Sequence, residues 1–436
     1  MKNTTLIALV AGAVTMTASS LVQASGRYEV WAIDQSADSD GDANAGILHV
    51  FEGSDAQYII GKAKKTHQID LQDAALAAGF DAGIKPHMTL FNTGATHMLV
   101  GHASNGVVYA IDADTKEVVD SYDLDDDLTS TSGKSHAATP APNNQFMVIS
   151  DTDVADVIVR VETDYAGGTG NIFGDATVIP VSGNSICGII TNDSNYGYVT
   201  IASGGLDIVD FRPGSDTENE VIYHYTADPS LKANAGDAIT VGEVGANGCG
   251  GFQVGDVVYI NSGNPNPQHQ DMVYAFDNAA LPGRPDIVKI PQNGNDTHGM
   301  SAPGNGNYLW ACNRGSNTCN VLDVSVSPFD PSADPSDPNR ISEVIDLEVG
   351  GILGDAAPDL TDTSPSGQLV FIAQRGPTPI SANDANFNNA KGDSPGVGVV
   401  ISIGGGSDGF PVQHYPLDNF VGGVNLADIH SLRVRK

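Results

Sequence analysis

The stretch IKPHMTLFNTGATHMLVGHASNGVVYAIDADTKEVVDSYDL, residues 84–124, decides the fold. Its short runs HMTLF, HMLVGH, VVYAID and EVVDSYDL are rich in Val, Ile, Tyr and Met, and residues such as Gly, Asn and Asp separate them. Runs of this composition between turn residues are typical of β-strands. Four such strands within about 40 residues are the repeat unit of a β-propeller blade.

The same pattern returns along most of the chain. Five further units begin near residues 133, 183, 247, 293 and 356. The C-terminal ADIHSLRVRK matches only the first strand of a unit, and the N-terminal runs RYEVWAID, GILHVFE and KTHQIDL match the other three. Joining both ends in a seventh unit closes the ring and removes the open sheet edge. We therefore predict an all-β, seven-bladed β-propeller that forms a single domain over residues 25–436.

Residues 1–24 have the features of a secretory signal peptide. Lys2 precedes an apolar run, and Ala24 supplies the small residue that cleavage requires. This run is too short for a membrane span and no other is long enough, so we expect an exported chain, periplasmic or secreted, without a membrane span after cleavage.

The formal net charge of −33 excludes nucleic acid and anionic membrane surfaces as partners, because like charges repel. The expected ligand is a small molecule or a metal ion, and a periplasmic protein is a further candidate partner.

Equivalent positions in the blades form a ring, because the first strand of each blade lines the central channel. Aligning the starts of these strands gives the column His87, His136, Cys187, Cys249, His298, Asp359 and His430. Four histidines and a carboxylate from five consecutive blades are a ligand set for a transition metal, zinc or copper. The alternative is that these histidines join neighbouring blades by hydrogen bonds. The alignment matters, because a shift of one residue turns a side chain to the other face.

The loops between the second and third strands of the blades are expected to open on the same face as these histidines. Arg314 and Arg375 occupy equivalent points in adjacent blades, and His102 ends a second strand. Arginine binds anions through charge-assisted hydrogen bonds, so these three residues are candidate contacts for a small anionic substrate. The alternative for the arginines is pairing with the many acidic side chains.

Four cysteines in an exported chain allow two disulfides. Cys312 and Cys319 flank a short turn between two strands of one blade, which predicts a disulfide across a hairpin. Cys187 and Cys249 fall in the channel column of adjacent blades. A second disulfide is predicted there, and thiolate binding of a metal is the alternative.

An acidic loop near the N-terminus is a candidate calcium site. It places the carboxylates of Asp38, Asp40 and Asp42 close together. The spacing does not match the EF-hand pattern, in which a glycine follows three liganding positions. The alternative is a solvated acidic turn.

The runs KPHM, KSHAATPAPNNQFMVISD, DTHGMSAPGNGNYLW and SPSGQLVFIAQRG resemble the repeats of YVTN-type β-propellers of exported bacterial proteins. The resemblance covers nearly all of the predicted domain. In this group, nitrous oxide reductase and thiocyanate dehydrogenase bind copper clusters through channel-facing histidines, and a periplasmic zinc chaperone has a similar channel site. The resemblance implies that His87, His136, His298 and His430 are metal ligands here.

Three functions are compatible with the sequence. The first is a transition-metal site at the mouth of the channel, for metal handling or for metal-dependent oxidation of a small molecule. The second is a polysaccharide lyase or hydrolase, in which His or Tyr acts as acid and base. The net charge of −33 disfavours a uronate polymer as its substrate. The third is a non-catalytic binding scaffold, because the fold alone does not define the function.

Overall fold

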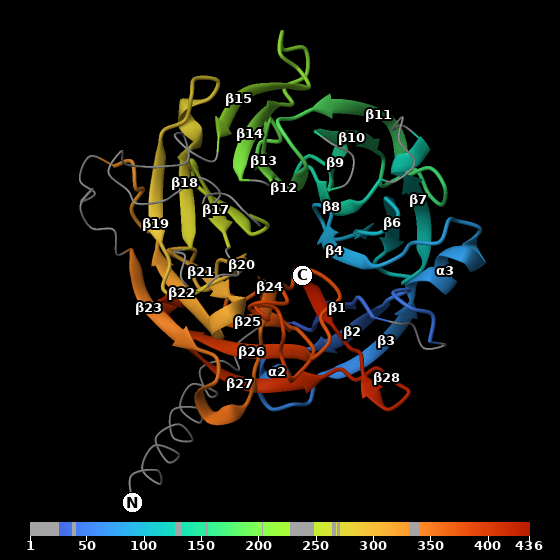
Figure 1. Ribbon diagram of the computed structural model, residues 1–436, viewed down its shortest axis with the longest axis vertical. Coiled ribbons are helices and arrows are strands. Elements are labelled where there is room, and N and C mark those ends of the chain that lie inside the picture. The colour runs from blue at the N-terminus through green and yellow to red at the C-terminus, as the bar shows by residue number, and fades with distance from the viewer. Residues whose placement is uncertain are drawn as a thin grey trace, which may run out of the picture.

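The computed structural model describes residues 26–36, 41–126, 133–152, 156–202, 204–226, 248–263, 267, 271–330 and 340–436. Within these residues, seven four-stranded sheets are arranged around a common axis (Figure 1). The predicted all-β, seven-bladed propeller is confirmed. The predicted signal peptide lies outside the described residues.

Each blade is one antiparallel sheet, and both ends of the chain contribute to one of them. That blade contains β30 (Ile429–Arg435), β1 (Tyr28–Asp34), β2 (Ile47–Gly53) and β3 (Lys64–Asp70). The next three contain β4 (Pro86–Phe91), β5 (His97–His102), β6 (Val107–Asp112) and β7 (Val118–Asp123); β8 (Ser135–Pro140), β9 (Phe146–Asp151), β10 (Val157–Thr163) and β11 (Phe173–Pro180); and β12 (Ser185–Ile190), β13 (Tyr196–Ile201), β14 (Gly205–Asp210) and β15 (Glu220–Thr226). The last three contain β16 (Gly251–Val254), β17 (Val257–Ser262), β18 (Met272–Asp277) and β19 (Ile287–Pro291); β20 (Thr297–Ser301), β21 (Tyr308–Asn313), β22 (Thr318–Asp323) and β23 (Ile341–Asp346); and β24 (Pro358–Thr363), β25 (Leu369–Gln374), β26 (Gly396–Ile403) and β27 (Asp408–Pro416).

Short elements connect or flank the strands of the blades. They are the helices α2 (Asp55–Ile59) and α3 (Leu71–Ala78), the hairpin β28 (Phe420–Val421) and β29 (Val424–Asn425), and the 3-10 turns η1 (Leu124–Asp126), η2 (Asn278–Ala280), η3 (Arg314–Ser316), η4 (Val349–Gly351) and η5 (Gly404–Gly406). α3 ends at Gly79, whose φ of 88° is a left-handed conformation that glycine adopts without a steric penalty. In the described part of the chain, no helix combines the length and the hydropathy that a membrane span requires.

The hydrophobic cores lie mainly between neighbouring blades. In one of them, Trp31 and Leu48 of the first blade pack with Met98 and Tyr109 of the next, and all four side chains are fully buried. A small sheet with two apolar faces cannot bury both by itself, so each blade depends on the neighbour at either side.

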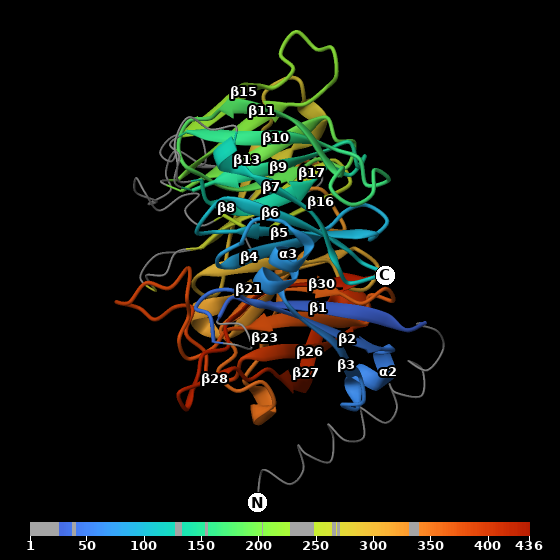
Figure 2. The ribbon, with the colours of Figure 1, turned by 90° about the vertical axis from the view of Figure 1, so that its right-hand side faces the viewer.

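β30 and β1 join the two ends of the chain in one antiparallel ladder. Val30 lies opposite Val434, and Ile33 lies opposite Ser431. Figure 2 shows this pair from the side, with β30 next to β1. The ring is therefore closed by backbone hydrogen bonds, and β1 is not an open edge.

Candidate metal centre

The innermost strands of several blades contain a β-bulge at the predicted column. In β4, His87 and Met88 lie opposite the single residue Gly101 of β5. Similar shifts in register occur at His136 in β8, His298 in β20, Asp359 in β24 and His430 in β30. A bulge bends the strand and changes the direction of its side chains. His87 and the following Met88 can therefore both reach the channel, where Met88 packs with residues of other blades.

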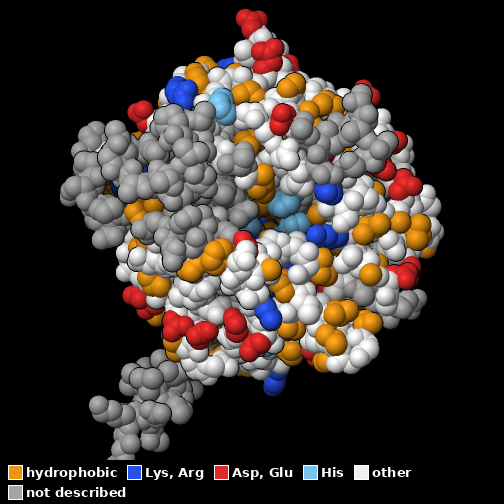
Figure 3. All heavy atoms as spheres, in the orientation of Figure 1, with side chains coloured by type: hydrophobic (Ala, Val, Ile, Leu, Met, Phe, Trp, Pro, Cys, Tyr) orange, Lys and Arg blue, Asp and Glu red, His pale blue; other side chains and the backbone are white. Residues whose placement is uncertain are grey.

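The four predicted histidines form one row around the channel. The ring centroids of His136 and His87 are 4.2 Å apart, those of His87 and His430 3.7 Å, and those of His430 and His298 6.0 Å. His136 is half-buried and the other three are buried. The space-filling view shows histidine side chains in a central hollow with basic side chains beside them (Figure 3). The aligned positions in the sequence thus correspond to one cluster of side chains.

His298, Asp359 and His430, here called the histidine–aspartate group, bring three donor atoms together, all within 4.8 Å of one another. His298 Nε2 lies 3.2 Å from Asp359 Oδ1, and His430 Nε2 lies 3.8 Å from Asp359 Oδ2. In the described structure, the two Nε2 atoms and Asp359 Oδ1 have no partner with hydrogen-bond geometry. Buried polar atoms that make no hydrogen bond are costly, and a cation between them would contact all three.

A hydrogen bond to His87 fixes the tautomer of His430. His430 Nδ1 lies 3.1 Å from the backbone oxygen of His87 and 3.1 Å from His87 Nδ1. A carbonyl oxygen can only accept, so His430 Nδ1 carries the hydrogen and Nε2 keeps its lone pair. Metal-binding histidines are commonly oriented in this way by a hydrogen bond from the other ring nitrogen. In this arrangement His87 positions His430 for metal binding.

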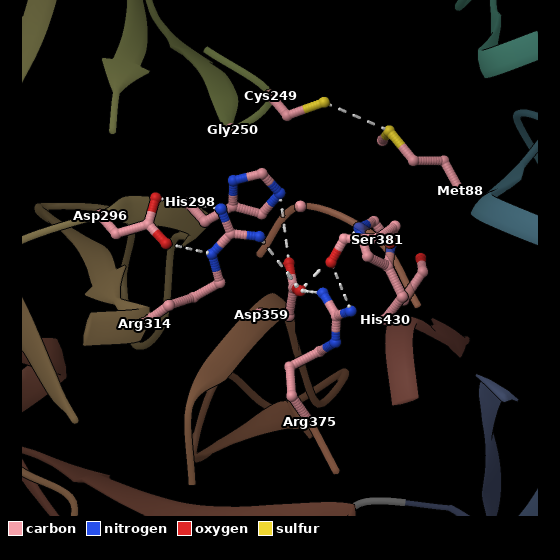
Figure 4. A network of polar contacts seen from close by, with 12 residues as sticks. Met88, Cys249, Gly250, Asp296, His298, Arg314, Asp359, Arg375, Ser381 and His430 are labelled. Carbon is pink, nitrogen blue, oxygen red and sulfur yellow. Dashed lines mark hydrogen bonds and ion pairs between the residues drawn. The ribbon is translucent and has the colours of Figure 1, made fainter. Parts of the chain in front are cut away.

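Five buried charged side chains form an alternating row, here called the charge row, that contains Asp296, Arg314, Asp359, Arg375 and Asp428. Figure 4 shows the first four of them. Arg314 donates to both carboxylate oxygens of Asp296 at 2.7 and 3.0 Å, and Arg375 donates to both of Asp428 at 2.6 and 2.8 Å. Asp359 Oδ2 lies 2.5 Å from Arg375 Nη1 and 3.5 Å from Arg314 Nη1. The two arginines therefore hold Oδ2, and Oδ1 remains for a ligand.

The site holds its side chains in the protonation states that metal binding needs. Burial lowers the pKa of His136 and His298 to about 4, and it lowers the pKa of His87 and His430 well below the usual range. Burial raises the pKa of Asp359, but His298 and the two arginines of the charge row outweigh this effect and lower it. At neutral pH the imidazoles are neutral and the carboxylate is ionised, as a transition metal requires.

A cavity of about 600 Å³ opens onto this cluster. Its lining includes His87, His136, His298, Arg314, Lys85 and Lys134. Lys85 and Lys134 give this lining positive charge, although the chain carries a net charge of −33, whereas the charge of Arg314 is compensated by Asp296. A concave site lined by one sign of charge concentrates ligands of the opposite sign, so the cavity favours a small anion.

The loop between β25 and β26 forms another wall of the cavity through residues 379–383. Arg375 Nη2 donates to the backbone oxygen of Ser381 at 2.9 Å, and Ile380 N donates to Asp428 Oδ2 at 2.7 Å. The charge row therefore fixes the cavity wall as well as Asp359.

Two of the three predicted substrate contacts lie away from the cavity surface. His102 is fully buried in its blade, where Nδ1 lies 3.0 Å from the backbone oxygen of Val107 and the ring packs on Tyr109. Neither His102 nor Arg375 is among the described residues that line the cavity, and Arg375 binds Asp359 instead. Their positions do not support direct contact with a substrate, whereas Arg314 does line the cavity.

Both predicted disulfides are present in the described residues. Cys312–Cys319 joins β21 and β22 of one blade, and Cys187–Cys249 joins β12 to the segment before β16 of the next blade. Cys187 and Cys249 are bonded to each other, so in this state neither is a thiolate ligand. In the predicted calcium loop, which also contains Asp42, the residues Asp38 and Asp40 lie outside the described part of the chain.

A second column, not predicted from the sequence, lies two residues before the histidines. Its members are Lys85, Lys134, Asp296 and Asp428, which precede His87, His136, His298 and His430. The two lysines line the cavity, and the two aspartates bind the arginines of the charge row. Extending the aligned column by two residues would have revealed them.

Comparison with solved structures supports the fold. A candidate 6-phosphogluconolactonase from Bacteroides fragilis superposes with a TM-score of 0.55 at 12% identity, covering 94% of this chain and 98% of that one. The β-propeller domain of Cps50 (Swd1) from Myceliophteria thermophila gives a TM-score of 0.50 at 10% identity, covering 76% and 88%. At these identities the likeness shows the propeller fold alone. Neither a protein-family model nor a curated protein sequence matches the chain.

Proposed function

We propose that this chain is an exported propeller that binds a transition metal, copper or zinc, through His298, His430 and Asp359. The bound ion would serve metal handling or metal-dependent oxidation of a small molecule. The observation that carries the proposal is the convergence of three buried donor atoms that have no hydrogen-bond partner in the described structure. Two disulfides support export, because disulfides persist in oxidising compartments.

The donor set fits a site for zinc or copper. Two imidazoles and one carboxylate are common ligands of both ions, and three protein ligands leave a position for a further ligand. The hydrogen bond from His430 to His87 and the hydrogen bonds from the arginines to Asp359 supply the outer contacts that orient such ligands. A bound ion would supply Lewis acidity, and copper would also supply one-electron transfer.

The cavity next to the histidine–aspartate group fits a small anion as the further ligand or substrate. Lys85, Lys134 and Arg314 come from three different blades and line the same space. Arg314 is already bound to Asp296, which fixes its position and compensates its charge, so the two lysines supply the positive charge of the lining. The lyase or hydrolase and the binding scaffold predicted as alternatives gain no comparable support.

The test is the metal content of untagged protein purified without added chelator. We expect bound copper or zinc in the wild type and a loss of affinity of about 10-fold or more in His298→Ala and in His430→Ala, because each change removes a donor atom. Elemental analysis and competition with a chromophoric chelator measure both quantities.

His67→Ala is the matched control, because His67 is exposed on β3 and lies outside the cluster. Circular dichroism confirms that each variant retains the β-sheet spectrum. If folded His298→Ala and His430→Ala proteins keep the metal content of the wild type, the histidine–aspartate group is not the metal site.

A further inference from the structure

A second group of donor atoms lies at the channel, separate from the histidine–aspartate group. It consists of Cys187, Cys249, Met88 and His136, here called the sulfur cluster. Met88 Sδ lies 3.4 Å from Cys187 Sγ and 3.6 Å from Cys249 Sγ. His136 Nδ1 lies 3.6 Å from Cys187 Sγ and 3.7 Å from Cys249 Sγ. Figure 4 shows the sulfur atoms of Cys249 and Met88 directed toward each other from different blades.

These distances match the spacing of ligands around a tetrahedral ion. Metal bonds of about 2.3 Å to sulfur and about 2.0 Å to imidazole nitrogen separate neighbouring donor atoms by about 3.5–3.8 Å. The four contacts of Met88 and His136 with the two cysteine sulfurs are already close to this range. Of these four contacts and the disulfide bond, only the bonded pair, Cys187 and Cys249, is too close together. Cleavage of that one bond would leave four donors around one point.

We propose that reduction of the Cys187–Cys249 disulfide converts the sulfur cluster into a second metal site, which binds Cu(I). Two thiolates, one thioether and one imidazole form a soft donor set, and soft ligands select Cu(I). The surroundings agree, because the apolar side chains Ala137, Ile186 and Leu360 belong to the same buried cluster as the sulfurs. The site uses none of the three residues of the histidine–aspartate group.

The other disulfide shows that these contacts are not a general feature of disulfides in the fold. Cys312 and Cys319 are fully buried inside a single blade, and their cluster consists of apolar residues such as Trp310, Val321 and Ile345. Cys187–Cys249 instead joins two blades at the channel, next to an imidazole and a thioether.

The cavity provides a route to the sulfur cluster. His136 is half-buried, and both His136 and Ile186 line the cavity. A small dithiol can enter and transfer two electrons and two protons to the disulfide, which gives two cysteine thiols and the cyclic disulfide of the reductant. Binding of Cu(I) then releases the two thiol protons to solvent as the thiolates form.

The test is an anaerobic titration with Cu(I) against bicinchoninate. The native chain is treated with a phosphine reductant, desalted and compared with untreated chain. We expect the reduced chain to bind one more equivalent of Cu(I) than the oxidised chain, and Cys187→Ser/Cys249→Ser to lose this increment. Met88→Leu is expected to weaken it, and X-ray absorption should show sulfur ligands to copper.

Cys312→Ser/Cys319→Ser is the matched control and should keep the increment. The titration is repeated in His298→Ala and in His430→Ala, where the increment should also remain. A missing metal at the histidine–aspartate group is thereby distinguished from a missing Cu(I) site at the sulfur cluster. Equal Cu(I) binding by reduced wild type and by Cys187→Ser/Cys249→Ser overturns the proposal. A disulfide that resists reduction in the folded chain, or a chain that unfolds on reduction, also overturns it.

Discussion

The buried histidines of the histidine–aspartate group and His102 have different environments. His298 and His430 face other donor atoms, and His298 also lines the cavity, whereas His102 is enclosed by its own blade. Burial lowers the pKa of His102 to about 4, compared with the usual value of 6.5. Within the described residues, its Nε2 atom has no hydrogen-bond partner. This side chain is therefore neutral in the folded protein over a pH range in which the unfolded chain takes up a proton.

The stability of the protein should fall as the pH drops through this range, and His102 should contribute to the fall. Between pH 6.5 and about 4 the unfolded state binds the proton and the folded state does not, so acid favours unfolding. At about 1.4 kcal/mol for each pH unit, the contribution approaches about 3 kcal/mol. We expect His102→Asn, whose amide can still donate to Val107, to remove this part of the pH dependence.

Urea unfolding of both proteins at about pH 7 and about pH 4.5 measures the difference. The control is His67→Asn, at an exposed position on β3, which should leave the pH dependence unchanged. Equal acid destabilisation of wild type and His102→Asn would show that His102 does not contribute.

The innermost strands and the loop after β25 depend on the charge row. Asp428 accepts two hydrogen bonds from Arg375 and one from the backbone of Ile380. The same arginine binds Asp359 and Ser381. A substitution at Asp428 is therefore expected to affect the last blade, the loop between β25 and β26 and the orientation of the proposed ligand Asp359.

We expect Asp428→Asn to lower the free energy of unfolding by about 3 kcal/mol or more, because it leaves Arg375 buried with less compensating charge. Chemical denaturation in the presence of a chelator measures this effect without a contribution from bound metal. The partly exposed ion pair between Arg27 and Glu52, at 2.9 Å, provides the comparison. Glu52→Gln should cost less than about 1 kcal/mol. Equal effects of the two substitutions would mean that the charge row does not stabilise the fold.

The strands and the histidine column could be predicted because each depends on a local pattern that repeats. Runs rich in Val, Ile and Tyr define the strands, and the same offset within each unit selects His87, His298 and His430. A strict alternation of the two sheet faces along each strand would place some of these side chains on the wrong face. The bulges that change their direction depend on how many residues the neighbouring strand pairs with them.

The partners of the arginines could not be predicted, since they come from other segments. Asp428 lies 53 residues from Arg375 in sequence, and the many acidic residues offer numerous alternatives. His102 shows the same limit. Its place at the end of a strand suggested the cavity, but contacts with Val107 and Tyr109 turn it into the blade.

The complete ring depends on the strand that joins its two ends. Ile429, Leu432 and Val434 of β30 are buried in a core that also contains residues of β1 and of the last blade. Burial of each side chain contributes about 2 kcal/mol, and the sum is comparable with the stability of a typical domain.

Deletion of residues 429–436 should therefore abolish cooperative unfolding and cause association through the exposed edge of β1. Thermal melting followed by circular dichroism and size-exclusion chromatography measure both effects. Deletion of Lys436 alone, an exposed residue, should behave like the wild type. A monomeric truncated protein with an unchanged melting transition would show that the remaining blades do not need the closing strand.

The bond between His430 and His87 joins residues that are 343 positions apart in the chain. Contacts of such high sequence separation form slowly, because their loop-closure entropy is lost before other contacts compensate for it. A partly folded chain with an open ring has neither His430 next to His87 nor the complete set of donors. An ion that binds only the closed ring draws the folding equilibrium toward it by mass action. Metal bound at the histidine–aspartate group would therefore distinguish chains with a closed ring from partly folded chains.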